Sequence, residues 1–153
     1  ALNPKDVDLK KRTISITKSY QRLGKKDVIT PPKTPKSKRV ITVPEFLAAD
    51  IKDYMDSLYD LQEDDRLFPI TKYYLEHEMQ RGIKESGVKR IRVHDLRHSH
   101  ASMLIELGFS PLEIANRLGH EKVETTLNTY AHLYPNKQTK LAERLDSEYR
   151  EDL

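Results

Sequence analysis

The chain has 153 residues, of which 37% are hydrophobic and 33% charged, and this fits one domain with a core of its own. It contains no cysteine, so neither a disulfide nor a cysteine-ligated zinc site can form. The sequence has no apolar run long enough to span a bilayer and no signal-peptide pattern, so we expect a cytoplasmic protein that does not enter the membrane.

The net charge of +3 conceals a strong asymmetry along the chain. Residues 1–39 carry 12 Lys and Arg against 3 Asp, whereas residues 45–85 carry 5 basic against 11 acidic side chains. Residues 88–140 are basic again, with 8 against 5, and residues 141–153 are acidic, with 2 against 5. Clustered cations release counterions from a phosphate backbone, so this pattern favours double-stranded DNA as the partner over a merely solvated surface.

The beginning of the chain is predicted to form a small antiparallel sheet. Residues 7–20 alternate in polarity and carry β-branched side chains, which indicates one or two short strands. Residues 24–26 form a turn, and another strand starts at residues 28–29. Residues 31–35, with three prolines, are predicted to be a stiff hairpin connection to a strand over residues 39–43.

The remainder of the chain is predicted to be helical. The expected helices span residues 45–60, 71–86, 94–107, 111–118, 122–133 and 137–150. Ser110, Pro111 and Glu113 form a capping box with proline at the first helical position, and Gly119 ends that helix. We therefore expect a mainly helical α+β fold, in which a small antiparallel sheet with a hairpin is followed by a helical bundle.

The second half of the chain contains side chains suited to attack on a phosphodiester. The sequence His94-Asp95-Leu96-Arg97-His98 is followed by Leu118-Gly119-His120 and then by Tyr130. A tyrosine can act as a nucleophile, an arginine can hold the negative oxygens of a phosphate, and histidines can transfer protons.

The order of these motifs resembles the tyrosine recombinase, or phage integrase, family. That family has His-x-x-Arg, then Leu-Gly-His, then a Thr-Thr-rich stretch ending in the nucleophilic Tyr; here the motifs read HDLRHSHAS at 94–102 and LGHEKVETTLNTY at 118–130. The resemblance implies a tyrosine recombinase catalytic-domain fold. It also implies site-specific DNA recombination or integration through a 3′-phosphotyrosyl intermediate and a Holliday junction, without a cofactor or a metal. The ending NTYAHLYPN favours an integrase of a phage or conjugative element.

The resemblance also assigns roles to individual residues. Tyr130 matches the nucleophile, with Tyr134 as the alternative four residues later. Arg97 matches the second of the family's two catalytic arginines and would hold the non-bridging oxygens. His94 would orient the phosphate and accept the proton of the tyrosine, and His120 would hydrogen-bond the phosphate.

The family also carries a general-acid lysine on a β-hairpin. Lys33, which lies before the strand over residues 39–43, matches that lysine, and Lys36 is the alternative. The cations predicted to contact DNA phosphates are Lys25, Lys26, Lys36, Lys38 and Arg39.

The family's first catalytic arginine precedes an Ala-Leu-x-x-x-Asp-Val stretch, which is where this chain begins, at Ala1. We therefore expect residues 1–136 to be a catalytic domain without its first helices and first arginine, inactive in isolation. Residues 137–153 are expected to form a tail helix that docks on a neighbouring protomer or folds back on its own domain. Full-length protomers would be monomers alone and tetramers on bacterial DNA, assisted by a directionality factor.

Two other readings of the sequence remain open. Residues 110–125 also resemble the helix-turn-helix of a repressor, which would bind DNA without cleaving it. His94, His98 and His100 cluster on one helix and could hold a metal, but the Glu of the zinc-protease motif is absent.

Overall fold

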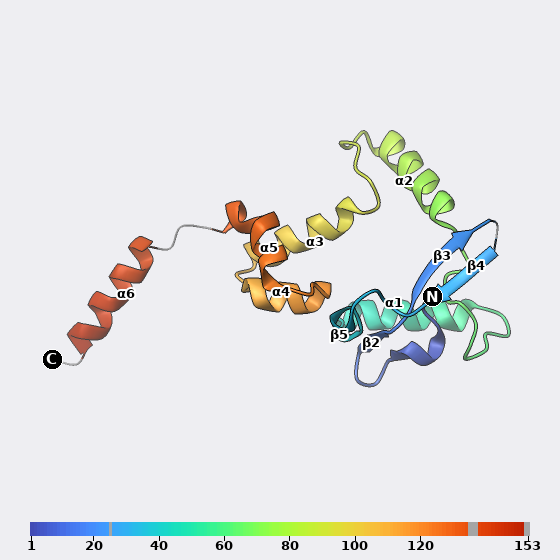
Figure 1. Ribbon diagram of the computed structural model, residues 1–153, viewed down its shortest axis with the longest axis horizontal. Coiled ribbons are helices and arrows are strands. Elements are labelled where there is room, and N and C mark those ends of the chain that lie inside the picture. Colours follow the sequence, from blue (N-terminus) through green and yellow to red (C-terminus); the bar gives the residue numbers. More distant parts are fainter. Residues whose placement is uncertain (25, 135–137, 152–153) are drawn as a thin grey trace.

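The chain folds into two small sheets followed by helices, as the computed structural model in Figure 1 shows. The structure describes residues 1–24, 26–134 and 138–151. Within them the strands are β1 (Val7–Asp8), β2 (Thr13–Ile16), β3 (Ser19–Leu23), β4 (Lys26–Thr30) and β5 (Arg39–Thr42). The α-helices are α1 (Glu45–Ser57), α2 (Lys72–Ser86), α3 (Asp95–Glu106), α4 (Pro111–Leu118), α5 (Val123–Tyr130) and α6 (Gln138–Glu151). Short 3₁₀ turns are η1 (Pro4–Asp6), η2 (Pro35–Ser37) and η3 (Ala131–Leu133). The predicted mainly helical α+β fold is confirmed.

The strand pairing differs from the predicted hairpin in one respect. β5 pairs with β2, with Ile41 opposite Ile14, and β2 also pairs with β1; both pairings are antiparallel. β4 pairs instead with β3, through a tight turn in which Gly24 has a φ of 54°. The prediction that residues 31–35 connect two paired strands is therefore wrong, because this segment crosses from one sheet to the other. Its prolines cannot donate backbone hydrogen bonds and end β4, while the short β3–β4 turn closes at little entropic cost.

α1 and α2 follow the sheets. α1 ends at Ser57, three residues before the predicted end, because Leu58 is extended and Asp60 adopts a positive φ of 50°. α2 begins where the Thr71 side chain accepts a hydrogen bond from the backbone N of Tyr74, and it ends at Gly87.

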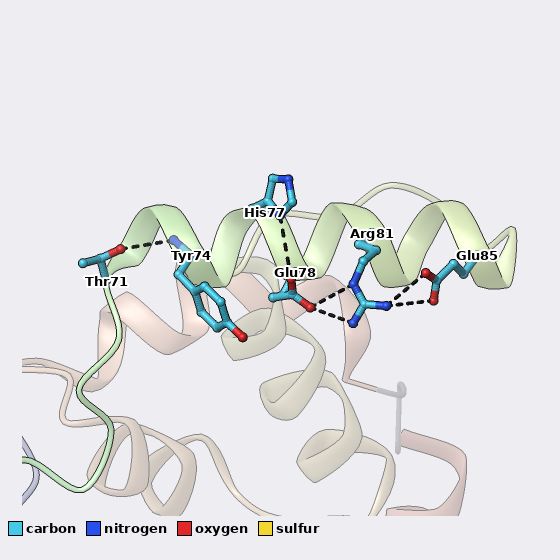
Figure 2. A network of polar contacts seen from close by, with 6 residues as sticks. All are labelled: Thr71, Tyr74, His77, Glu78, Arg81 and Glu85. Atoms are coloured by element: carbon cyan, nitrogen blue, oxygen red, sulfur yellow. Dashed lines mark hydrogen bonds and ion pairs between the residues drawn. The ribbon is translucent and has the colours of Figure 1, made fainter.

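α2 is held by local contacts on its own surface. Arg81 joins Glu78 and Glu85 in the network that Figure 2 shows. No residue of α2 is buried. Exposed ion pairs of this kind contribute little stability. α2 therefore supplies no side chain to the core within the described residues.

The helices α3, α4 and α5 form the hydrophobic core that carries the sequence motifs. Its buried members are Ala101, Leu104, Ile105, Ile114, Leu118 and Tyr130. The predicted capping box is present, because Ser110 accepts from the backbone N of Glu113, whose carboxylate accepts from the backbone N of Ser110. Gly108 and Gly119, with φ of 86° and 73°, reverse the chain after α3 and α4. Tyr130 is thus part of the core that holds the two histidine motifs together.

Truncation of Ile114 should destabilise this helical unit strongly. Ile114 is 0% exposed, so Ile114→Ala removes buried methyl groups and leaves a cavity. We expect the free energy of unfolding to fall by about 2–5 kcal/mol, measured by urea denaturation. Leu112→Ala is the control, since Leu112 lies on the same helix and is 59% exposed. Equal losses in the two variants would contradict this assignment of the core.

α6 lies apart from the other elements in Figure 1. Its apolar side chains Leu141, Leu145 and Tyr149 recur every four residues and are 54%, 63% and 70% exposed. The boundary predicted between residues 136 and 137 falls outside the described residues. Among the helices that the structure describes, none is long and apolar enough to cross a membrane.

Candidate active site

The first turn of α3 determines which charges remain for a ligand. Asp95 accepts hydrogen bonds from the guanidinium and the backbone N of Arg92, both at 2.8 Å, and this pairing lowers the pKa of Asp95 to about 2. Glu113 is similarly occupied by Ser110. Neither carboxylate pairs with Arg97 within the described residues, so the charge of Arg97 is available to a phosphate.

Arg97 is half-buried and directed at the C-terminal end of α4. Its Nη2 donates to the carbonyl O of Leu118 at 2.7 Å. Burial raises the pKa of Tyr130, and the nearby charge of Arg97 acts in the opposite direction. The structure therefore brings Arg97 and Tyr130, which come from separate motifs, into one site.

Tyr130 is hydrogen-bonded to His98, to which the family resemblance assigned no catalytic role. It is 4% exposed, and its hydroxyl lies 2.7 Å from Nδ1 of His98. His94, at the N-cap of α3, is exposed, and its ring packs edge-on against that of His98 at a centroid distance of 5.2 Å. His98 thus lies between His94 and the phenol. The i,i+4 spacing of the two histidines places both on one helix face and is the signal that could have identified His98.

His120 lies in the segment between α4 and α5, directly after Gly119, and is held by Thr126. Its Nδ1 lies 2.8 Å from Oγ1 of Thr126, which is completely buried. This bond fixes the orientation of the imidazole, so Nε2 is the ring nitrogen that can meet a ligand. Burial lowers the pKa of His120, and the charges of Arg97 and Arg39 lower it further.

We expect His120 to remain neutral to a lower pH than an ordinary histidine, whose pKa is about 6.5. Arg97→Gln should raise the pKa of His120 only part of the way back, because burial, the larger cause, remains. The folded state binds this proton less readily than the unfolded state, so stability should decrease as the pH falls below about 6.5. NMR titration of the imidazole measures the pKa in both proteins. An unchanged midpoint in Arg97→Gln would contradict the placement of Arg97 beside His120.

The predicted lysines lie on or near the segment that crosses between the two sheets. Lys33, Lys36 and Lys38 are exposed, and their side chains make no hydrogen bond or ion pair within the described part of the chain. Lys26 is exposed at the start of β4, and Lys25 lies outside the described residues. These positions leave the choice between Lys33 and Lys36 as the general acid open.

Arg39 differs from these lysines, because its side chain turns from β5 toward the helices. Its Nε donates to the carbonyl O of Arg117 at 2.8 Å and its Nη1 to that of Ser37 at 3.1 Å. A Cβ added to Gly119 would lie 2.6 Å from Nη1 of Arg39, so the guanidinium rests against the Gly119 backbone. An added Cβ would displace this guanidinium, and the positive φ of Gly119 favours a glycine.

The three histidines of α3 have different surroundings. His98 meets Tyr130, whereas Nε2 of His100 accepts a hydrogen bond from Nε of Arg117 at 3.0 Å. Over residues 1–24, 26–134 and 138–151, no group of three or more His, Cys, Asp or Glu is placed to hold a metal ion.

The fold and these side chains together define the class of protein. Two small sheets precede a helical unit that brings together a buried tyrosine, Tyr130, with Arg97, His98 and His120 of the other motifs. This arrangement agrees with the tyrosine recombinase catalytic domain that the sequence motifs resemble.

Comparison with known sequences gives the same family. The Phage integrase family pattern matches residues 1–137. The chain is 34% identical to the ICEBs1 integrase of Bacillus subtilis (strain 168), over 95% of this chain and 43% of that protein. It is 30% identical to the integrase of Staphylococcus phage L54a, over 95% of this chain and 46% of that protein. The chain belongs to the phage integrase family, and it spans less than half the length of these two relatives.

Solved structures show the same fold. The Tn1549 transposon integrase, in a complex with circular intermediate DNA, aligns with 97% of this chain at a TM-score of 0.77 and 21% identity; 52% of the solved chain is covered. The XerA recombinase aligns with 96% of this chain at a TM-score of 0.58 and 26% identity, with 50% of the solved chain covered. The predicted resemblance is confirmed at the level of family and fold.

Proposed function

We propose that this chain carries the strand-cleaving site of a site-specific DNA recombinase, with Tyr130 as the nucleophile. The observation that carries the proposal is the Tyr130 hydroxyl, which is held 2.7 Å from Nδ1 of His98. A phenol has a pKa of about 10 and needs a base to accept its proton. His98 is in position to do so, and Arg97 is close enough to act on the same phenol.

The proposed cleavage step balances without a cofactor. Oη of Tyr130 attacks the phosphorus while its proton passes to Nδ1 of His98, and the bond from phosphorus to the 5′ oxygen breaks. The 5′ oxygen takes a proton from Lys33, with Lys36 as the alternative donor. Arg97 and Nε2 of His120 bind the non-bridging oxygens, whose charge grows in the transition state. Attack by another 5′-hydroxyl on the phosphotyrosine reverses the step and rejoins DNA.

The proposed substrate is double-stranded DNA at a specific attachment site. The basic composition of residues 1–39 and the exposed Lys26, Lys36 and Lys38 support this, because clustered cations release counterions from the DNA backbone. Lys25 belongs to the same basic stretch. The integrase of Tn1549 was crystallised with DNA, which agrees with the proposal.

The proposed assembly is a tetramer on DNA that forms from monomers and passes through a Holliday junction. Residues 1–136 would form the catalytic unit, and residues 137–153 the tail helix that a neighbouring protomer receives. The exposed apolar stripe on α6 supports this role for the tail. A directionality factor would choose between integration and excision, and the reaction would take place on DNA in the bacterial cytoplasm.

We further propose that these 153 residues alone do not complete strand exchange. The family's first catalytic arginine has no counterpart among them by the motif described above. The two relatives named above are also more than twice as long as the part this chain matches. Efficient recombination by residues 1–153 alone would contradict this part of the proposal.

Covalent trapping tests the proposed function. The chain, with any natural sequence that flanks it, is incubated with a pool of duplexes of randomised sequence, each nicked in one strand. Cleavage beside the nick releases a short fragment that diffuses away, so the strand cannot be rejoined. We expect an adduct that survives denaturant, with protein on a 3′ phosphate and a free 5′-hydroxyl on the released fragment. Linkage to a 5′ end, or no adduct, would contradict the proposal.

A further inference from the structure

Two arginines, one in β5 and one in α4, join the sheets to the helical unit. Each donates a hydrogen bond to a backbone carbonyl of the other's element. Arg39 of β5 donates through Nε to the carbonyl O of Arg117 in α4, at 2.8 Å. Arg117 donates through Nη1 to the carbonyl O of Thr42, at the end of β5, at 3.0 Å. Among the described residues, no other hydrogen bond or ion pair links residues 1–71 with residues 91–134. We name this pair of side chains the arginine clasp.

One end of the arginine clasp is connected to the segment that carries Lys33. Nη1 of Arg39 donates to the carbonyl O of Ser37 at 3.1 Å. Ser37 in turn closes a turn with Thr34, through its backbone N at 3.1 Å and through the two hydroxyls at 2.9 Å. Thr34 directly follows Lys33, so a short hydrogen-bonded turn connects the backbone beside Lys33 to the clasp.

The other end of the arginine clasp contacts the segment that aligns the phosphate-binding groups. Nε of Arg117 donates to Nε2 of His100 in α3 at 3.0 Å. The next carbonyl, that of Leu118, accepts from Arg97. The backbone of Gly119, which precedes His120, lies against the clasp guanidinium. The clasp therefore spans from the general-acid segment to the groups that surround Tyr130.

The two units are not closely packed against each other everywhere. An open pocket of about 550 Å³ lies between the end of β5 and helices α3 and α4, lined in part by Val43, Leu104 and Phe109. Apolar side chains leave this space unfilled, so the directed hydrogen bonds of the clasp contribute to setting the relative position of the two units. Both clasp donors are guanidiniums, whose rigid fork suits paired bonds to fixed carbonyls.

We propose that the arginine clasp positions the Lys33 segment against Tyr130, so that the departing 5′ oxygen receives its proton as its bond to phosphorus breaks. Arg39 and Arg117 are then positioning residues, and this inference rests on the proposed function. It assigns to Arg39 a role that differs from the phosphate contact predicted for Arg39 from the sequence.

A modified DNA substrate separates positioning of the general acid from every other role. The sequence recovered from the randomised pool is made twice, once with the normal 5′ oxygen and once with sulfur at that bridging position. A thiol has a pKa of about 8.5, so the sulfur leaves as a thiolate and needs no proton donor. A defect in general-acid delivery affects the oxygen substrate and disappears with the sulfur substrate.

We expect Arg39→Ala to slow single-turnover cleavage of the oxygen substrate by about 10²-fold, as a small misplacement of a catalytic group does. Cleavage of the sulfur substrate should proceed at the rate of the unmodified protein. Lys33→Ala, or Lys36→Ala if that lysine is the acid, should show the same pattern. Arg97→Ala should slow both substrates, because it acts on the non-bridging oxygens. Arg81→Ala is the matched control, since Arg81 is an exposed arginine in the α2 network of Figure 2.

The inference would be overturned if Arg39→Ala slowed both substrates equally or slowed neither. It would also be overturned if the sulfur substrate restored the cleavage rate of neither Lys33→Ala nor Lys36→Ala. Absence of any adduct with the unmodified protein would instead overturn the proposed function. Arg39→Lys tests whether a folding defect explains the effect of Arg39→Ala, because lysine keeps the charge but cannot make both directed hydrogen bonds. It should fold normally by circular dichroism and still show a defect that sulfur relieves. Arg117→Ala should show the same pattern as Arg39→Ala. The cleavage rate of the double variant Arg39→Ala/Arg117→Ala should fall by less than the product of the two single effects, because both substitutions break the same clasp.

Discussion

Tyr130→Phe should abolish the covalent adduct with nicked DNA while leaving DNA affinity unchanged. The phenylalanine ring keeps the core packing of a side chain that is 4% exposed, but it has no oxygen to attack phosphorus. The lost bond to His98 should cost only about 0.5–1.5 kcal/mol of folding stability, so the variant remains folded. Adducts are counted on denaturing gels, and affinity is measured by filter binding at fixed salt.

Tyr134→Phe is the matched control for this variant. Tyr134 lies four residues later, packs against the same core, and its hydroxyl is buried without a hydrogen-bond partner among the described residues. Its loss should therefore leave both adduct formation and stability intact. If Tyr130→Phe still forms the adduct, the nucleophile is wrongly assigned. If the unmodified protein binds DNA but never forms an adduct, the helix-turn-helix repressor is the better interpretation.

Arg97→Ala should reduce the single-turnover rate of adduct formation by about 10²–10³-fold, the usual cost of removing a donor to a developing charge. Arg97 has no carboxylate partner within the described residues, and its charge already acts on Tyr130. Arg97→Lys should recover only part of the rate, because an ammonium cannot make the paired bonds of a guanidinium fork.

Arg81→Ala provides the control for Arg97→Ala, because Arg81 is an arginine of α2 that pairs with Glu78 and Glu85 and is 57% exposed in its side chain. It should leave the rate unchanged. Urea denaturation accounts for any stability lost with the bond from Arg97 to Leu118. A full cleavage rate in Arg97→Ala would exclude this residue from the phosphate site.

The helical half of the molecule could be predicted from the sequence because its signals are local. The capping box at Ser110 and Glu113 and the glycines at 108 and 119 each act within one turn of the backbone. The order of strands could not be predicted in the same way. The pairing of β5 with β2, rather than with β4, depends on contacts between segments more than 20 residues apart.

The candidate site could be predicted only in part, because its geometry also depends on contacts between distant segments. The motifs identify Arg97 and Tyr130, but the spacing places both His94 and His98 on one face of α3. Which imidazole meets the phenol depends on how α5 packs against α3, and the sequence does not contain that geometry. The contact of Arg39 with Gly119 likewise depends on strand pairing, since β5 directs this side chain toward α4.

Identification of the tyrosine bonded to DNA tests the central claim most directly. The trapped adduct is digested with nuclease and trypsin, and the peptide over residues 123–137, which contains both Tyr130 and Tyr134, is fragmented in a mass spectrometer. We predict that the nucleotide phosphate is attached to Tyr130. Attachment to Tyr134, or to any tyrosine outside this peptide, would contradict the account.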